Sequence, residues 1–449
     1  MLPPRPQSLL PTSSRTMTSL LASSSPSTSV FEDHAHYDND SRNNGSKDDG
    51  ENSRPMYTFG VLTDIQYAPI PNGHSYAGNA RYYRHSIDAA NVAATHFQNE
   101  RVQCVLNLGD IIDGKCADVE RWGGGSSSGS LKEEEDEEDE KKDEEESIAG
   151  ENDGEEKTAK QDSNVVSVGH DAINDVLEAL SIYQVGRIVH TYGNHELYNL
   201  SRKELAKKLL IPFTLESTND LVGYYDHLLD EPYHHHHLCC MNNNNDAWKL
   251  RFVIIDSFDI SLLDRCPNTS SKYHAAHEIM KANNPNYQHG QENSPENLVG
   301  LQRRFVAFGG GVDNPQLRWL EQTLKFARVN NEKIILCSHQ PIHPGSSFPT
   351  CLIWNYNDIL CMVRKYSDVI IASFSGHAHK GGYVRDADSG VHFRTFEAML
   401  ESPPPICTYA IVDLFANRLD VRGMGDCVSD SYDLDHLYIK KKLCGDARD

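Results

Sequence analysis

Short apolar segments that each stop at a polar residue recur along the chain and predict the strands of a sheet. They are too short for most helices and are rich in Val, Ile, Leu and Phe, as buried strands are. The predicted strands are Tyr57–Thr63, Val102–Gly109, Arg187–Tyr192, Leu250–Ile255, Lys333–Ser338 and Val369–Ser375.

Helical spacing of apolar residues appears between these segments. Residues Arg81–Glu100 carry it in Ile87, Ala90, Ala94 and Phe97, and Val176–Leu180 and Trp319–Phe326 behave in the same way. Strands that alternate with helices predict α/β layering, in which ligands gather beyond the carboxyl ends of the strands. The polar residues that follow the strands stand at those ends.

Several segments lack any such periodicity, and we expect them to lie outside the folded domain. They are a Ser-, Pro- and Asn-rich tail at 1–53, an acidic insertion at about 123–163, a His- and Asn-rich loop at 234–247 and a C-terminal tail at 429–449. The remaining 54–428 is predicted to form one domain.

The charge of the chain is concentrated in the acidic insertion. Between Leu131 and Lys157 there are 16 acidic and 4 basic residues, about half of the net charge of −23. No cluster of Lys and Arg is visible elsewhere, which argues against a nucleic-acid groove because such grooves need clustered positive charge. An anionic substrate would therefore be held by metal ions.

Eleven cysteines, scattered without a C-x-x-C motif, are typical of reduced thiols and predict a cytoplasmic protein. The Ser- and Thr-rich N-terminus, with no acidic residue before Glu32, leaves import into an organelle as the alternative. No apolar run approaches the ~20 residues that a bilayer span requires, so no membrane association is expected. We also expect a monomer.

Five predicted strands are each followed by residues of types that commonly bind metal ions. Asp64 and Gln66 follow the first, Asp110 the second and Asn194 the third. Further along, the last two strands are followed by His339 and by the pair His377 and His379. Taken alone, any one of these histidines is more often structural, but the ordered set predicts a metal site.

Such a set suits the hydrolysis of phosphate compounds. Two cations about 3.5–4 Å apart can clamp phosphoryl oxygens and activate a water bridging them. We expect Asp110 to bridge the two ions. The ligands completing one ion would be Asp64, Gln66 and His379, and those completing the other Asn194, His339 and His377.

The order of these motifs resembles the metallophosphoesterases, whose signature runs D-x-H, G-D-x-x-D, G-N-H-[DE], a lone His and G-H-x-H. Within that family, several stretches look like the manganese-dependent ADP-ribose/CDP-alcohol diphosphatases. They are RYYRHS from Arg81, LGDIIDG from Leu108, YGNHELYN from Tyr192, SHQPIHP from Ser338 and SGHAHKGGY from Ser375. The likeness covers roughly 57–424, apart from the insertions.

The resemblance implies a sandwich of two mixed β-sheets flanked by helices. It also implies hydrolysis of the phosphoanhydride bond in nucleoside diphosphate derivatives such as ADP-ribose or CDP-choline, with release of a nucleoside monophosphate. In that family, His195 would face the substrate and support the leaving oxygen as an acid or hydrogen-bond donor. Tyr76 and Cys351 would border the nucleotide pocket.

Gln66 stands where most metallophosphoesterases place the His of D-x-H, and the diphosphatase subfamily carries Gln there as well. An amide oxygen is a harder and weaker ligand than imidazole, which favours Mn²⁺ or Mg²⁺ over Zn²⁺. We therefore expect two divalent ions, Mn²⁺ before Mg²⁺, Fe or Zn²⁺.

Three alternatives remain open at this stage. The same site could serve a phosphomonoesterase or a cyclic-nucleotide phosphodiesterase, because loops decide the substrate. A catalytically silent interaction module could keep the fold, although all seven ligand positions are occupied.

Asp113 and Glu196 are read as turn and helix-capping residues and are left out of the ligand set.

Overall fold

The computed structural model describes residues 54–75, 78–117, 168–212, 221–229, 248–263 and 270–437. The chain separates into two units, Met1–Asp49 and Gly50–Asp449, and every described residue belongs to the second. The predicted N-terminal tail, the acidic insertion and the His- and Asn-rich loop lie outside the described residues.

Two six-stranded sheets form the centre of the second unit. The strands of the first, in spatial order, are β16 (Asp430–Asp433), β15 (Arg418–Met424), β14 (Tyr409–Leu414), β1 (Tyr57–Leu62), β4 (Cys104–Asn107) and β5 (Arg187–His190). Those of the second are β12 (Lys380–Arg385), β13 (His392–Glu397), β11 (Ile370–Ser375), β10 (Glu332–Ser338), β7 (Lys249–Ile255) and β6 (Tyr225–Leu228).

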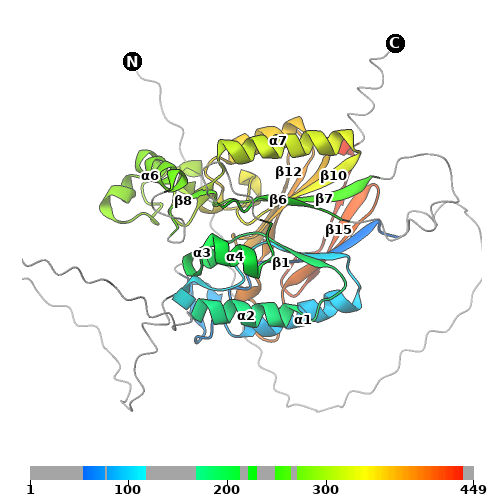
Figure 1. Cartoon of the computed structure of the whole chain (residues 1–449), viewed down its shortest axis with the longest axis horizontal. Helices are drawn as coiled ribbons and strands as arrows, with labels where there is room; N and C mark the ends of the chain where they lie inside the picture. The colour runs from blue at the N-terminus through cyan, green and yellow to red at the C-terminus, as the bar shows by residue number, and fades with distance from the viewer. Residues whose placement is uncertain are drawn as a thin grey trace, which may run out of the picture. The chain divides into compact units, whose positions relative to one another are not determined.

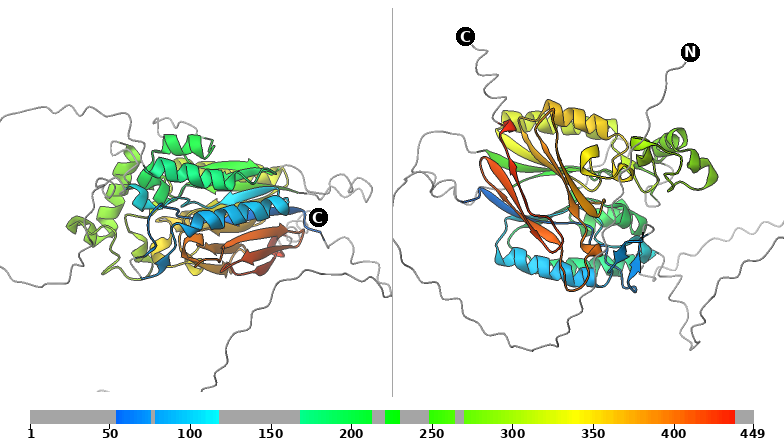
Figure 2. Two further views of the ribbon diagram at one scale, coloured as in Figure 1. Left: turned by 90° about the horizontal axis from the view of Figure 1, so that it is seen from below. Right: turned by 180° about the vertical axis from the view of Figure 1, so that it is seen from behind.

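Both sheets are mixed. Strands β1, β4 and β5 run parallel in one, and β7, β10, β11 and β13 run parallel in the other, while the remaining strands of each sheet pair antiparallel with their neighbours. The sheets face each other (Figures 1 and 2), and the ring of Phe59 packs 5.1 Å from Phe252 and 6.4 Å from Phe374 in the layer between them. The predicted sandwich is confirmed, and each of the six predicted strands is present.

Helices cover the outer faces of the sandwich (Figure 1). Helices α1 (His85–Asn99) and α2 (Val168–Leu180) lie against the first sheet, and α7 (Asn314–Val329) and α8 (Tyr356–Lys365) against the second. The fit is close, since a Cβ at Gly60 of β1 would lie 2.7 Å from the Phe97 ring of α1. Central strands buried on both faces read as continuous apolar runs, which explains why they were predictable.

The remaining helices, ribbons and turns lie outside the two large sheets and the helices that cover them. They are α3 (Asn194–Asn199), α4 (Arg202–Lys208), α6 (Ser271–Asn283), the ribbons β2 (Gly73–His74) with β3 (Ala80–Arg81) and β8 (Ile260–Ser261) with β9 (Gly310–Gly311), and the 3-10 turns η1 (Gly114–Ala117), η3 (Pro285–His289), η4 (Gly300–Arg304), η5 (Pro344–Ser346), η6 (Pro349–Cys351) and η7 (Met399–Glu401). Among the described helices, none is long and apolar enough to cross a membrane.

The predicted boundary at 428 is wrong, because the fold continues into the expected C-terminal tail. Strand β16 pairs antiparallel with β15, and Tyr432, Leu434 and Leu437 are buried. The segment has too few apolar positions to show a period, and its burial depends on partners far away in the sequence. The predicted tail therefore begins no earlier than residue 438, outside the described part.

Candidate metal and active site

The predicted ligands converge where parallel strands of both sheets end. Asp64 and Asp110 follow β1 and β4, and Asn194 opens α3 after β5. From the second sheet, His339 follows β10 and His377 follows β11. Donor atoms of Asp110, His339 and His377 all lie within 4.8 Å of one another, so the loops of the two sheets meet at one site.

Left-handed backbone marks most of these positions. The φ angles are 49° at Asp64, 43° at Gln66, 57° at Asp110, 66° at His377 and 31° at His379. Residues other than glycine rarely adopt this conformation, which costs of order 1–3 kcal/mol each and is maintained where surrounding structure imposes it. The chain thus turns sharply at each strand end, and the side chains point into the site.

Three glycines of the motifs allow the loops to approach so closely. A Cβ at Gly193 would lie 2.0 Å from Asp110 Oδ1, and one at Gly109 would lie 2.7 Å from His339 Nδ1. At Gly376 the added atom would lie 2.0 Å from Thr63 Oγ1. Any larger residue would displace a candidate ligand or its support.

Asp110 is central to the cluster. Its Oδ2 lies 3.2 Å from His339 Nε2 and accepts a hydrogen bond from Gln66 Nε2 at 2.9 Å, while its Oδ1 accepts one from the backbone N–H of His195 at 2.9 Å. His377 Nδ1 lies 3.1 Å from His339 Nε2. The carboxylate of Asp110 therefore contacts candidate ligands of both predicted groups, as a bridging carboxylate must.

The second predicted group lies beside it. His379 Nε2 lies 3.4 Å from Asp64 Oδ1 and 3.3 Å from Gln66 Nε2. The other oxygen of Asp64 accepts hydrogen bonds from Thr63 Oγ1 at 2.6 Å and from the backbone N–H of His377 at 3.0 Å. The hydrogen bonds to one oxygen thus orient the Asp64 carboxylate, which leaves its other oxygen available to a metal ion.

The donor set fits divalent cations. Four buried atoms of the predicted ligands lack a hydrogen-bond partner: Asp64 Oδ1, Gln66 Oε1, Asn194 Oδ1 and His377 Nε2. Buried polar atoms without partners are costly and call for an ion or another ligand. Oxygen and imidazole donors together suit Mn²⁺ and related ions, whereas no thiolate donates here.

Outer contacts fix two of the imidazole rings. The carbonyl of Leu108 lies 2.7 Å from His339 Nδ1, and Glu401 Oε1 lies 2.9 Å from His379 Nδ1. Each contact holds Nδ1 and presents Nε2 to the site, which is how metal-binding histidines are commonly oriented. Glu401 could not be predicted, because it lies outside the motifs, in the turn η7, whose residues show no recognisable pattern.

The electrostatics are those of a site that exchanges protons for cations. Burial would raise the pKa of Asp110, but His339 and His195 outweigh it and hold this pKa well below its usual range. Burial opposes the charged form of His339 and His379, yet nearby carboxylates raise the pKa of each ring to about 9. Cation binding must release these protons.

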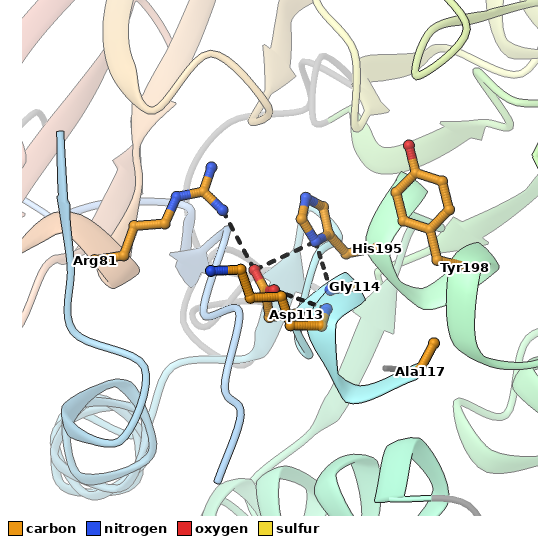
Figure 3. A pocket seen from close by; sticks show the side chains of 7 residues that line it. Arg81, Asp113, Gly114, Ala117, His195 and Tyr198 are labelled. Carbon is orange, nitrogen blue, oxygen red and sulfur yellow. Dashed lines mark hydrogen bonds and ion pairs between the residues drawn. The ribbon is translucent and has the colours of Figure 1, made fainter. Parts of the chain in front are cut away.

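His195 stands beside the ligands. Its Nδ1 accepts a hydrogen bond from the backbone N–H of Gly114 at 2.7 Å and lies 3.4 Å from Asp113 Oδ2 (Figure 3). Its Nε2 lies 3.9 Å from Asp110 Oδ2. An accepting Nδ1 places the proton of a neutral ring on Nε2. That N–H faces the predicted cation site.

The two residues read as structural have such roles. Glu196 accepts hydrogen bonds from Gly193 N at 3.0 Å and from Ile111 N at 2.7 Å, so it caps α3 and ties it to the loop after β4. Asp113 accepts from the backbone N–H of Lys115 at 2.9 Å, as a turn residue does. It also contacts Arg81 and His195, which the sequence did not indicate.

Aromatic rings line one side of the cluster. Phe258 lies 5.8 Å from the His339 ring, and Phe308 lies 5.9 Å from the His377 ring. Cys351 is partly buried in η6, where burial raises the pKa of its thiol to about 11 and the nearby Asp64 carboxylate adds to the effect. Tyr76, predicted to border the same pocket, lies outside the described residues.

Two facing mixed sheets, flanked by helices and bearing buried Asp and His side chains beyond their strand ends, define the metallophosphoesterase class. No family model matches the chain. In structure it resembles a dimetal phosphatase from Danio rerio, with a TM-score of 0.64 at 27% identity over 85% of this chain and 99% of that chain.

Curated relatives carry a more specific name. A manganese-dependent ADP-ribose/CDP-alcohol diphosphatase of Oryza sativa is 33% identical over 82% of this chain and 91% of its own length. The protein of that name from Bos taurus is 31% identical over 84% and 93%. The chain belongs to the manganese-dependent ADP-ribose/CDP-alcohol diphosphatase family.

Proposed function

We propose that this chain hydrolyses the phosphoanhydride bond of nucleoside diphosphate derivatives, such as ADP-ribose and CDP-choline, and releases a nucleoside monophosphate. The observation that carries the proposal is the set of unpartnered donor atoms on Asp64, Gln66, Asn194 and His377 around the carboxylate of Asp110. The names of the relatives supply the substrate class.

Manganese is the metal we propose, in agreement with those names and with the donors present. Asp64, Gln66 and His379 would hold one ion, Asn194, His339 and His377 the other, and Asp110 both. Gln66 would present Oε1 after a half-turn of its amide, since Nε2 now faces Asp110 and His379. Two bound cations would supply charge neutralisation of the phosphoryl group and activation of water.

His195 is assigned to the departing side of the reaction. Its Nδ1 accepts a hydrogen bond from the backbone N–H of Gly114, so Nε2–H is the donor that the ring offers toward the oxygen that leaves. This arrangement favours donation over full proton transfer, because a doubly protonated ring would set its Nδ1–H against the Gly114 N–H. Cys351 and Tyr76 remain proposed borders of the base pocket.

The site of action that we propose is the cytoplasm. The cysteines of the described part, seven in number, are all free, which agrees with a reducing compartment.

The test is a metal-reconstitution assay. Protein purified without metal is supplied with Mn²⁺, Mg²⁺ or Zn²⁺, and release of nucleoside monophosphate from ADP-ribose and CDP-choline is measured. We expect Mn²⁺-dependent release that vanishes in Asp110→Asn, which keeps the shape of the central ligand and removes its charge.

Simple phosphomonoesters and cyclic nucleotides are assayed in parallel. If these were cleaved and neither diphosphate were, the metal site would stand and the substrate assignment would be wrong. If Asp110→Asn retained full activity, the proposed metal site itself would be refuted.

A further inference from the structure

A cavity of about 320 Å³ opens beside His195 (Figure 3), and none of the proposed metal ligands is among the residues that line it. Its lining residues are Arg81, Asp113, Gly114, Lys115, Ala117, His195 and Tyr198. His195 forms the partition, because its Nε2 faces Asp110 and its Nδ1 faces Asp113 at the cavity. A ligand lying across this ring would thus touch both the cation site and the cavity.

The lining is cationic. Arg81 and Lys115 supply two positive charges against the single carboxylate of Asp113. That carboxylate lies 3.4 Å from the Arg81 guanidinium, whose Nε is buried without a hydrogen-bond partner. The ammonium of Lys115 lies 5.1 Å from the centre of the Tyr83 ring, and no acidic side chain in the described part of the chain pairs with it. The cavity suits an anion.

We propose that this cavity is the subsite for the second phosphate of a diphosphate substrate, the one that departs, with Lys115 and Arg81 as its binding groups. The inference rests on the proposed function and adds to it. The two phosphates of such a substrate share one bridging oxygen, so when the attacked phosphate lies at the Asp110 cluster the other must lie next to it. His195 stands between the two positions.

The bonds then change as follows. The oxygen of one water molecule bonds to the attacked phosphorus, and the bond from that phosphorus to the bridging oxygen breaks. Its electron pair stays on the bridging oxygen, which leaves as part of the phosphate in the cavity, and the protons of the water pass to solvent or product. His195 Nε2–H donates to that oxygen, and Lys115 offsets the charge that grows on the departing phosphate.

Lys115 is the residue to change, because its side chain is exposed and supports no hydrogen bond to a candidate ligand. Lys115→Met removes the charge and keeps the length, and Lys115→Arg keeps the charge. Lys281→Met, on the exposed face of α6, is the matched control. The substrates are CDP-choline, with two phosphates, and bis(p-nitrophenyl) phosphate, with one, both with saturating Mn²⁺.

We expect kcat/KM for CDP-choline to fall roughly tenfold or more in Lys115→Met, as for loss of a charge-assisted hydrogen bond, and to be largely kept in Lys115→Arg. Cleavage of bis(p-nitrophenyl) phosphate, which has no second phosphate, should fall far less in Lys115→Met than cleavage of CDP-choline. Equal losses on the two substrates, or no loss on either, would overturn the subsite.

A binding measurement separates this inference from the proposed reaction. The inhibitors AMP and α,β-methylene-ADP are compared against bis(p-nitrophenyl) phosphate cleavage, and the second phosphate should strengthen inhibition in the wild type but not in Lys115→Met. If that difference were present while no diphosphate was cleaved, the subsite would stand and the reaction would fall. Equal inhibition by both compounds in the wild type would refute the subsite whatever the reaction.

Discussion

His195 contributes to the site twice, through its backbone and through its ring. The backbone N–H binds Asp110 Oδ1, and the Nε2–H of the ring is proposed to donate toward the substrate. In His195→Ala the backbone contact remains, so we predict that bound metal is kept while kcat for CDP-choline falls about 10²–10³-fold, as for loss of one preorganised donor. Metal content by elemental analysis and turnover are measured on the same preparation.

The control is His289→Ala, an exposed histidine on η3. Its metal content and turnover should equal those of the wild type. Loss of metal from His195→Ala would contradict the assignment, since it would make the ring itself a ligand.

A residue of the site could be predicted when the residues next to it in the sequence formed a recognisable motif. Asp110 and His377 lie in short motifs that follow buried strands, and their glycines are visible in the sequence. Glu401 and Phe308 reach the site through contacts formed only when distant loops meet. Nothing in their neighbouring residues distinguishes them from ordinary surface or core positions.

Among the elements that carry no proposed ligand, η7 contacts the site through both its backbone and a side chain. The backbone N–H of Met399 and of Leu400 donate to the carbonyls of Thr63 and Asp64, at 3.3 and 3.0 Å, so η7 braces the loop after β1. Its last residue, Glu401, holds His379. One short turn therefore supports two of the proposed ligands.

We predict that Glu401→Ala weakens binding of Mn²⁺ about 10–100-fold, the usual cost of removing a carboxylate that orients a metal-bound histidine. The measurement is calorimetric titration of metal-free protein. Lys380→Ala is the matched control, because Lys380 binds the other oxygen of Glu401 and its loss leaves the contact with His379. Equal affinity in Glu401→Ala and wild type would show that Glu401 does not orient the ring.

The elements themselves were predictable in unequal measure. Central strands such as β1 and β10 are buried on both faces and read as unbroken apolar runs. Strands β12 and β16 lie at sheet edges and are half polar, so their sequences resemble loops. Half-polar edge strands such as these are specified by the partner that they pair with, and that information is not local.

Across the whole sandwich, the residues after β15 join the two sheets. Tyr432 of β16 in the first sheet stacks on Tyr383 and His392 of the second, with ring centroids 4.8 and 5.0 Å apart. Four residues further on, His436 bonds the carbonyl of Ile370 in β11 through Nε2 at 2.9 Å. The C-terminal segment thus closes one side of the sandwich.

His436 makes this closure sensitive to pH. The ring is 5% exposed and its Nδ1 has no hydrogen-bond partner. Burial lowers the pKa of His436 to about 4, although the hydrogen bond to the Ile370 carbonyl acts in the opposite direction. The titratable and charged groups around the ring are His392, Arg385 and Asp435. In the unfolded chain the ring titrates near its ordinary value of about 6.5.

As the pH falls below about 6.5, the unfolded state binds a proton at His436 that the folded state does not bind. The free energy of unfolding therefore decreases until the pH reaches about 4. From pH 7.5 to pH 5.0 we predict that His436 alone lowers the free energy of unfolding by about 2 kcal/mol. Over the same interval, the free energy of unfolding of His436→Gln, which keeps a donor for Ile370, should fall by about 2 kcal/mol less than that of the wild type. The measurement is urea unfolding at each pH. Parallel pH profiles for wild type and variant would show that other buried histidines govern the acid sensitivity of the sandwich.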